Sequence, residues 1–438
     1  MFDLPEVRTV PETGRRRVLF LNLNWIVGGQ EVVMLDLLRR LDQTRYEPFV
    51  VSSAEGLLTR TLRAEGIPTY LLPPHRLRKP LAVARAIAHL TQVLARERID
   101  LVHCNGDSLL FYGALAAAPL GIPCVWHVYE PVATGGNAYI RFLYLSQRRL
   151  RPAFTIFGTA AVEESYLRDY PRLGPHASIM PGVDVDALAH DADAARARAV
   201  LGVPPDVPLL LVIARLQRSK GQRELLEALA RLSGDFPAPH VAFCGGAPVQ
   251  TDEDYPGELE RLVVELGLTG RVHFAGQTSD ALKRDLLAAA TLLVHPAHRE
   301  AFGIVVLEGM AAGKPVVVTD AVGPASILAG SDAGLVVPAR DVAALREALR
   351  RILTDPETAR RMGERGRAHV RARYSSEGMV RRVESVYDAV LSERRTRPAT
   401  LVARAASAVS ARIPLGTKWI KTALSSQKSM PKGPMKGA

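Results

Sequence analysis

The chain has 438 residues, which is too long for one ordinary hydrophobic core and suits two domains of about 180 residues each. Its hydrophobic fraction of 47% and charged fraction of 23% are those of a globular protein and exclude an intrinsically disordered one. The net charge of +11 would suggest a nucleic-acid partner, but ten Lys and Arg residues and no acidic residue lie between Arg394 and Ala438. Subtracting these ten charges leaves +1 for the rest of the chain, so we expect a basic tail and no nucleic-acid partner.

Neither a membrane span nor a secretory signal is expected. The longest apolar candidate, Leu109–Leu120, is shorter than the roughly 18 residues of a transmembrane helix and is interrupted by a glycine and a proline. The N-terminus contains acidic residues and no apolar segment, unlike a signal peptide. The three cysteines lie far apart and lack CxxC spacing: Cys104, Cys124 and Cys244. Disulfides and structural zinc are therefore not expected, which favours the reducing cytoplasm.

The first part of the chain predicts a doubly wound α/β domain with a mostly parallel sheet over residues 17–190, after a loose N-terminus at 1–16. Its first strand, Val18–Leu23, is followed by a helix over about Gln30–Leu41. Short apolar runs and helical patterns then alternate at Phe49–Ser52, Leu57–Glu65, Thr69–Leu72, Leu81–Arg98, Leu101–Cys104, Leu109–Ala117, Cys124–Val128, Tyr139–Arg149, Phe154–Phe157, Ala160–Leu167 and Ser178–Met180.

A second α/β domain is predicted over residues 200–375, and the intervening Asp184–Ala199, which has no clear apolar face, is interpreted as a linker. A helix over 376–395 is expected to cross back to the first domain, followed by the tail at 396–438. Two such domains imply a cleft between them in which ligands bind. The elements expected in the second domain are Leu209–Ile213, Gln222–Leu232, Val241–Cys244, Glu258–Leu266, Val272–Ala275, Asp280–Ala290, Thr291–Val294, Gly303–Ala312, Pro315–Thr319, Leu335–Val337, Val342–Leu353 and Pro356–Arg373.

The stretch from His295 to Asp320 carries the most specific pattern. Glu300 lies in a loop after a buried strand, and Glu308 lies eight residues later in the helix expected to begin at Gly303. The free N–H groups and the dipole at a helix N-terminus attract phosphate. Carboxylates at the mouth and along the side of this helix could accept hydrogen bonds from sugar hydroxyls around that phosphate.

A basic turn follows the first strand of the second domain. In Ala214–Gly221, Arg215 offers a guanidinium fork and Lys220 a point charge, which together suit a diphosphate. A solvated basic turn is the alternative for such a pair, but its place between a strand and a helix favours ligand binding.

Two features of the first domain are candidates for the same site. Gly28 and Gly29 open a helix after the first strand, where they could form a tight turn or let a phosphate approach the backbone. The turn is not GxGxxG, and no acid follows the second strand, which argues against a dehydrogenase. His127 ends a strand beside aromatic residues, where it could be a structural hydrogen-bonding group or face a ligand.

Glu300-x7-Glu308, followed by Met310-Ala311-x-Gly313-x-Pro315-Val316-Val317, resembles the donor-site motif of retaining, GT-B-type glycosyltransferases of the large family 4. The resemblance covers roughly residues 17–390, and its second half is the more specific. The family's Gly-Gly-Ala-Glu turn has Gln30 in place of the alanine, and Glu31 keeps the acid. The family's Pro-Asn-Gly-Val-Asp segment at the domain junction lacks its Asn here, where Pro181-Gly182-Val183-Asp184 stands.

The resemblance implies a GT-B fold and retaining transfer of a sugar from a UDP- or GDP-sugar to a hydroxyl of a glycan or lipid-linked acceptor. The process implied is polysaccharide or glycoconjugate synthesis, without a metal or other cofactor. Arg215 and Lys220 would bind the donor diphosphate, Glu300 and His127 the sugar, and Glu308 the ribose. The remaining donor-binding positions implied are Gly28, Gly29, Ala301, Phe302, Gly303 and Ile304.

Two other functions stay open at this point. A nucleotide-sugar epimerase on the same fold would need paired acid and base residues in the cleft, and no convincing pair is visible. A non-catalytic adaptor could bind nucleic acid or membrane through the tail. The triplet Asp184-Val185-Asp186 could hold a metal in another glycosyltransferase architecture, but its position favours a hinge.

The tail predicts peripheral association with an anionic membrane surface. Trp419-Ile420 lies between Lys418 and Lys421, and indole rings favour the membrane interface. The alternative is a solvated, disordered segment, which the Pro, Gly and Ser content favours.

Overall fold

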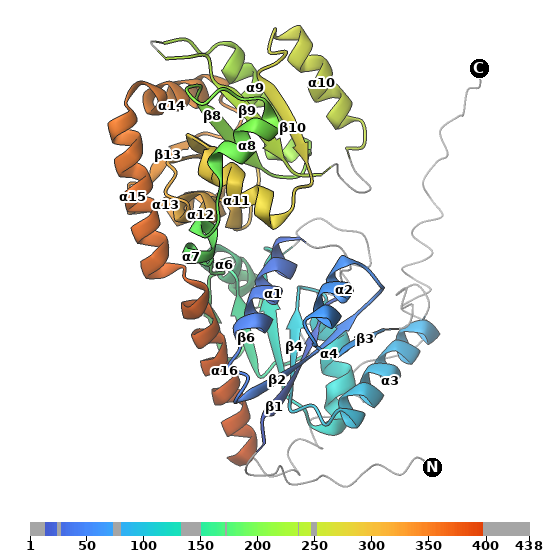
Figure 1. The fold of residues 1–438 in the computed structure, drawn as a ribbon. Helices are drawn as coiled ribbons and strands as arrows, with labels where there is room; N and C mark the ends of the chain where they lie inside the picture. Colours follow the sequence, from blue (N-terminus) through green and yellow to red (C-terminus); the bar gives the residue numbers. More distant parts are fainter. Residues whose placement is uncertain are drawn as a thin grey trace, which may run out of the picture.

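The computed structural model describes residues 14–23, 28–72, 80–132, 150–170, 173–234, 236–246 and 252–396. The basic helix expected at Tyr139–Arg149 and the tail beyond Thr396 lie outside these residues. None of the helices within the described ranges combines the length and apolar character needed to cross a membrane. The two predicted α/β halves form two separate parallel sheets, each covered by helices (Figure 1).

The first sheet has seven strands in the order β3-β2-β1-β4-β5-β6-β7. Its central strands are buried along their whole length, because helices cover both faces; this is why they read as continuous apolar runs. The strands are β1 (Arg16–Leu21), β2 (Tyr46–Ser52), β3 (Thr69–Leu71), β4 (Leu101–Asn105), β5 (Cys124–Val128), β6 (Phe154–Phe157) and β7 (His176–Ser178). The helices are α1 (Gly29–Arg40), α2 (Leu57–Ala64), α3 (Pro80–Arg96), α4 (Leu109–Ala117) and α6 (Ala160–Asp169).

The second sheet has six strands in the order β10-β9-β8-β11-β12-β13. In both sheets the strand order reverses beside the first strand, between β1 and β4 in one and between β8 and β11 in the other. Ligands of open α/β sheets bind at such a point. The strands are β8 (Leu209–Ile213), β9 (His240–Cys244), β10 (Val272–Gly276), β11 (Leu292–His295), β12 (Val316–Thr319) and β13 (Gly334–Val337). The helices are α9 (Gln222–Ala230), α10 (Tyr255–Glu265), α11 (Asp280–Ala289), α12 (Ile304–Ala311), α13 (Val322–Leu328), α14 (Val342–Thr354) and α15 (Pro356–Arg373).

The segment interpreted as a linker is largely helical, so that prediction was wrong. It forms α7 (Val185–Ala189) and α8 (Ala194–Leu201), and α8 packs on α11. Asp193 caps α8 by accepting a hydrogen bond from the backbone N–H of Arg196, whose guanidinium pairs with buried Asp285 at 2.6 Å. The contact face consists of small residues such as the fully buried Ala197, which is why no apolar stripe is visible in the sequence.

The chain crosses between the domains at two adjacent places. The backbone N–H of Val183 donates to Tyr374, and that of Ser376 donates back to Val183, so the two crossings run side by side. After the second crossing, α16 (Ser376–Thr396) lies against α1, and Figure 1 shows α15 and α16 following one another along one side of both domains. Val383 and Tyr387 of α16 are fully buried in the core of the first domain.

Candidate functional site

The site predicted from the sequence lies where the carboxyl ends of the two sheets face each other. The turn from β1 to α1 contains Gly28 and Gly29, and the turn from β11 to α12 contains Gly303. Ile304, the first residue of α12, packs against the core of the first domain. A methyl group added to Gly29 would lie 3.7 Å from Ile304 Cδ1, so these two turns approach each other closely.

Glu300 and Lys220 form an ion pair in this region. The Lys220 ammonium lies 2.8 Å from Glu300 Oε2, and His295 Nε2 lies 3.5 Å from the same oxygen. Burial alone would raise the pKa of Glu300, but the His295 imidazole and the Lys220 charge outweigh it and hold the pKa well below its usual range. Glu300 is therefore an ionised carboxylate, able only to accept hydrogen bonds.

Lys220 reaches Glu300 because its loop lies against the loop after β11. Gly221 has a φ of +70°, and a Cβ there would lie 2.0 Å from the carbonyl oxygen of Pro296. A side chain at this position would collide with backbone, so the glycine allows the two loops to approach.

The two arginines of the basic turn, Arg215 and Arg218, differ in their contacts. Arg218 pairs with Glu258 at 2.5 Å and stacks on the Tyr255 ring, so its charge is used within the domain. The exposed guanidinium of Arg215 makes no hydrogen bond or ion pair with the part of the chain that the structure describes. Arg215 can therefore turn its fork toward an anion.

Glu308 is buried on α12 and pairs with Lys283 of α11 at 2.7 Å. Burial alone would lower the pKa of Lys283, but the Glu308 carboxylate offsets this and raises it. Lys283 thereby fixes one oxygen of Glu308. Lys283 is not predicted from the sequence; the only signal is a lysine on the inward side of an amphipathic helix, which also suits a side chain extending to solvent.

Buried His127 stands at the end of a chain of polar groups. Its Nδ1 atom lies 3.2 Å from His103 Nε2 and 3.1 Å from the hydroxyl of Tyr129. His103 Nδ1 lies 2.7 Å from the hydroxyl of Tyr387, which comes from α16. Burial lowers the pKa of His103 to about 3 and, together with His103, lowers that of His127, so both rings are neutral. His127 Nε2 has no hydrogen-bond partner within the described residues.

Two further carboxyl groups follow strands of the first domain. Partial burial and the nearby Glu130 raise the pKa of Asp107 to about 7. Desolvation and the Glu300 carboxylate raise the pKa of Glu130, although Lys220 lowers it. Charges of the second domain therefore shift the pKa of Glu130, so the two domains contribute to one electrostatic environment. Neither Asp107 nor Glu130 is predicted from the sequence as a site residue, because isolated acids after a strand are common.

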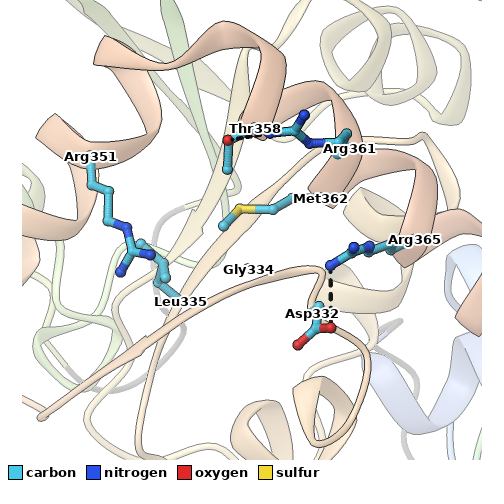
Figure 2. A pocket seen from close by; sticks show the side chains of 8 residues that line it. All are labelled: Asp332, Gly334, Leu335, Arg351, Thr358, Arg361, Met362 and Arg365. Atoms are coloured by element: carbon cyan, nitrogen blue, oxygen red, sulfur yellow. Dashed lines mark hydrogen bonds and ion pairs between the residues drawn. The ribbon is translucent and has the colours of Figure 1, made fainter.

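A hollow of about 520 Å³ lies elsewhere, beside the start of β13 and between α14 and α15. Figure 2 shows Arg351, Arg361 and Arg365 around it, with Arg365 3.2 Å from Asp332. In a parallel sheet the start of a strand is the edge opposite to its carboxyl end. The hollow is therefore separate from the region of Glu300.

Asp184 and Asp186 have structural partners. Asp184 caps α7 by accepting hydrogen bonds from two backbone N–H groups, and it pairs with Arg40 of the first domain. Asp186 pairs with Arg371 of α15 at 2.5 Å. These contacts join the segments near the domain crossing.

Within the described residues, the loops at the facing ends of the two sheets thus offer an unpaired guanidinium, an ammonium and a helix N-terminus beside an ionised carboxylate. This arrangement suits a diphosphate attached to a group with hydroxyls. The structure brings Lys220, Glu300 and the Gly303–Ile304 turn together, with Gly28 and Gly29 opposite.

Comparison with known proteins gives a consistent result. The family model for glycosyl transferases group 1 matches residues 193–369, and the model for glycosyltransferase family 4 matches residues 27–187. A D-inositol 3-phosphate glycosyltransferase of Corynebacterium urealyticum is 33% identical over 232 residues, which cover 52% of this chain and 54% of that protein. One from Catenulispora acidiphila is 29% identical over 401 residues, which cover 85% of this chain and 93% of that protein.

Solved structures share the fold. HepE of Anabaena in complex with UDP has a TM-score of 0.75 and 23% identity, and the match covers 85% of this chain and 100% of that one. A glycosyltransferase of Rickettsia africae also has a TM-score of 0.75, with 19% identity over 86% of this chain and 99% of that one. Since two adjoining family models match the two domains in turn, the chain belongs to the group 1, family 4 type of glycosyltransferases and has their GT-B fold.

Proposed function

We propose that the protein is a retaining glycosyltransferase that moves a sugar from a nucleoside diphosphate sugar to a hydroxyl of a glycan or lipid-linked acceptor. The observation that carries this proposal is the Lys220–Glu300 pair at 2.8 Å, together with Arg215 on the same turn, which has no partner among the residues that the structure describes. A diphosphate placed there would meet two cations, and a sugar attached to it would meet the carboxylate.

The chemical task is to stabilise the charge that develops on the departing diphosphate. Arg215, Lys220 and the backbone N–H groups at the start of α12 would do this as fixed donors in a partly desolvated cleft. These groups would supply the positive charge from the protein itself, so we propose that turnover needs no divalent ion. Glu300 would hold hydroxyls of the transferred sugar, and His127 would contact the same sugar from the first domain.

The donor is proposed to be a UDP- or GDP-sugar. HepE, which shares the fold, was crystallised with UDP and with UDP-glucose, and this supports testing UDP-sugars first. The names of the curated relatives add an inositol phosphate to the acceptors that should be tested. In each case the accepting group is a hydroxyl, as the proposed reaction requires.

Nucleotide binding is expected to depend on Glu308. A nucleotide at 100 times its dissociation constant should stabilise the wild-type protein by about 2.7 kcal/mol. The change Glu308→Ala removes a charged hydrogen-bond acceptor for ribose, which should weaken binding of the free nucleoside diphosphate about ten- to hundredfold. Calorimetric titration with UDP and GDP measures this change and identifies the preferred base.

Two variants control that experiment. Glu308→Gln keeps an oxygen near Lys283 and should bind nucleotide with intermediate affinity. Glu260→Ala alters an exposed acid on α10 and should bind like wild type. Wild-type affinity in Glu308→Ala would remove Glu308 from the nucleotide site.

We also propose that the enzyme works in the cytoplasm, held at the inner membrane face by its basic tail. An anionic surface attracts each nearby Lys or Arg by about 1 kcal/mol, and a few such contacts suffice for reversible binding. Deleting residues 397–438 leaves α16 intact and should reduce sedimentation with anionic liposomes. Wild-type binding should also weaken as salt rises from about 0.1 to 0.5 M, because screening shortens the reach of exposed charges.

The tail experiment has a charge-specific control. Full-length protein with Lys418→Glu and Lys421→Glu keeps Trp419 and the chain length but reverses two charges, and it should bind liposomes less. Donor hydrolysis should stay unchanged in both variants. Equal liposome binding by full-length and truncated protein would show that the tail is only a solvated extension.

A further inference from the structure

We propose that Tyr387, near the C-terminal end of the described chain, is a positioning residue for His127 and acts on it through His103. The proposal rests on the proposed function, in which His127 contacts the donor sugar. It adds that α16, which follows the second domain in the sequence, helps to orient the imidazole ring of His127 in the first domain.

The geometry forms an unbroken polar path across the buried sheet. The hydroxyl of Tyr387 lies 2.7 Å from His103 Nδ1, and His103 Nε2 lies 3.2 Å from His127 Nδ1. Tyr387 and His103 are fully buried and His127 is 1% exposed, so water does not compete for these contacts. The path ends at His127 Nε2, the ring nitrogen that has no partner within the described residues.

The rings along this path are fixed from the side as well. Phe20 stacks on His103 with ring centroids 4.8 Å apart, and Tyr129 stacks on His127 at 4.3 Å. Rotation of either imidazole would break a hydrogen bond and a stacking contact together. The orientation of His127 Nε2 is thus determined by groups that lie behind the cleft.

Tyr387 also determines where the imidazole protons lie. Both histidines are neutral, so each carries one proton on one of its two nitrogens. Within the described residues, His103 Nδ1 is the only hydrogen-bond partner of the Tyr387 hydroxyl, so the hydroxyl donates there and leaves the proton of His103 on Nε2. The proton on His103 in turn decides whether His127 Nδ1 accepts or donates, and therefore whether Nε2 presents a proton or a lone pair to the sugar.

A neighbouring tyrosine separates this role from helix packing. Tyr46 is also buried, and its ring lies 5.6 Å from that of Tyr387. Its hydroxyl donates to Asp388 of α16 at 2.7 Å and has no contact with either histidine. Tyr46→Phe therefore removes one hydroxyl from the same helix–sheet interface without interrupting the path.

The experiment compares Tyr387→Phe, Tyr46→Phe and His127→Ala in the full-length protein. In Tyr387→Phe, kcat should fall roughly tenfold, because removing a hydrogen-bonding group that orients a functional histidine has an effect of this size. The affinity for UDP, which lacks the transferred sugar, should stay within twofold of wild type. Tyr46→Phe should keep the wild-type kcat, although both variants can lose thermal stability.

Nitrogen NMR of histidine-labelled protein tests the path independently of turnover. Wild type and Tyr46→Phe should show one tautomer of His127, and Tyr387→Phe should show a mixture or the other tautomer. The inference is overturned if His127 keeps its wild-type tautomer in Tyr387→Phe, or if both tyrosine variants lose kcat equally. Wild-type turnover in His127→Ala would instead refute the sugar contact in the proposed function, and the NMR comparison would still decide whether Tyr387 controls the ring.

Discussion

Replacing Lys220 with alanine is expected to lower kcat/KM about ten- to hundredfold. A charge-assisted contact to the leaving diphosphate contributes roughly 1.5–3 kcal/mol, and this contribution is lost. The loss should be larger than that of a surface cation, because Lys220 is partly buried and its removal also leaves Glu300 without its partner at 2.8 Å. Initial rates over a range of donor concentrations measure the effect.

The same turn supplies the control for Lys220. Arg218 lies two residues away, but it is directed to Glu258 and Tyr255, so Arg218→Ala should leave kcat/KM nearly unchanged. Lys220→Ala activity within twofold of wild type would contradict the diphosphate assignment. Treatment of the wild type with EDTA should leave its rate unchanged, whereas inactivation reversed only by a divalent ion would show that a metal shares this task.

Replacing Glu300 with alanine is expected to reduce turnover roughly a hundredfold while nucleotide affinity stays near that of the wild type. The proposed contacts of Glu300 go to the sugar, and removing one group that acts mainly in the transition state typically costs about 2.7–4 kcal/mol. The ionised state of Glu300 matters here, because a carboxylate accepts hydrogen bonds at both oxygens and donates none, and the depressed pKa of Glu300 keeps it in that state. Single-turnover rates, together with UDP titration, separate the two effects.

Glu300→Gln provides the matched change for this prediction. It keeps the shape of the side chain but removes the charge that Lys220 and His295 surround. If charge is the important property, Glu300→Gln should resemble Glu300→Ala in turnover. Equal losses of nucleotide affinity in the Glu300 and Glu308 variants would show that the division between sugar and ribose is incorrect.

The sequence predicts this fold well because parallel strands buried on both faces leave a clear pattern. The expected strands Cys124–Val128 and Leu209–Ile213 agree with β5 and β8 at both ends. Each is a short apolar run, and little besides a central strand explains such a run between two helical patterns. The region of α8 was misread, since alanines can pack a helix without producing an apolar stripe.

The candidate site is predictable only where its residues follow a local pattern. Lys220 and Glu300 lie 80 residues apart, and their pairing follows from two strand ends in adjacent positions of one sheet. The contact between His103 and Tyr387 spans 284 residues and depends on how α16 packs across the first domain. Neither residue type nor spacing predicts such a contact, because a tyrosine on an apolar helix face is usually only a packing residue.

The return of α16 to the first domain affects how the molecule is made. A ribosome completes the first sheet and α1 long before it adds Val383 and Tyr387, which close that side of the core. During synthesis the apolar face of α1 and the face of the sheet beside it remain uncovered. The first domain to emerge is therefore the last to finish folding, and a fragment that stops after the first domain would expose a surface prone to aggregation.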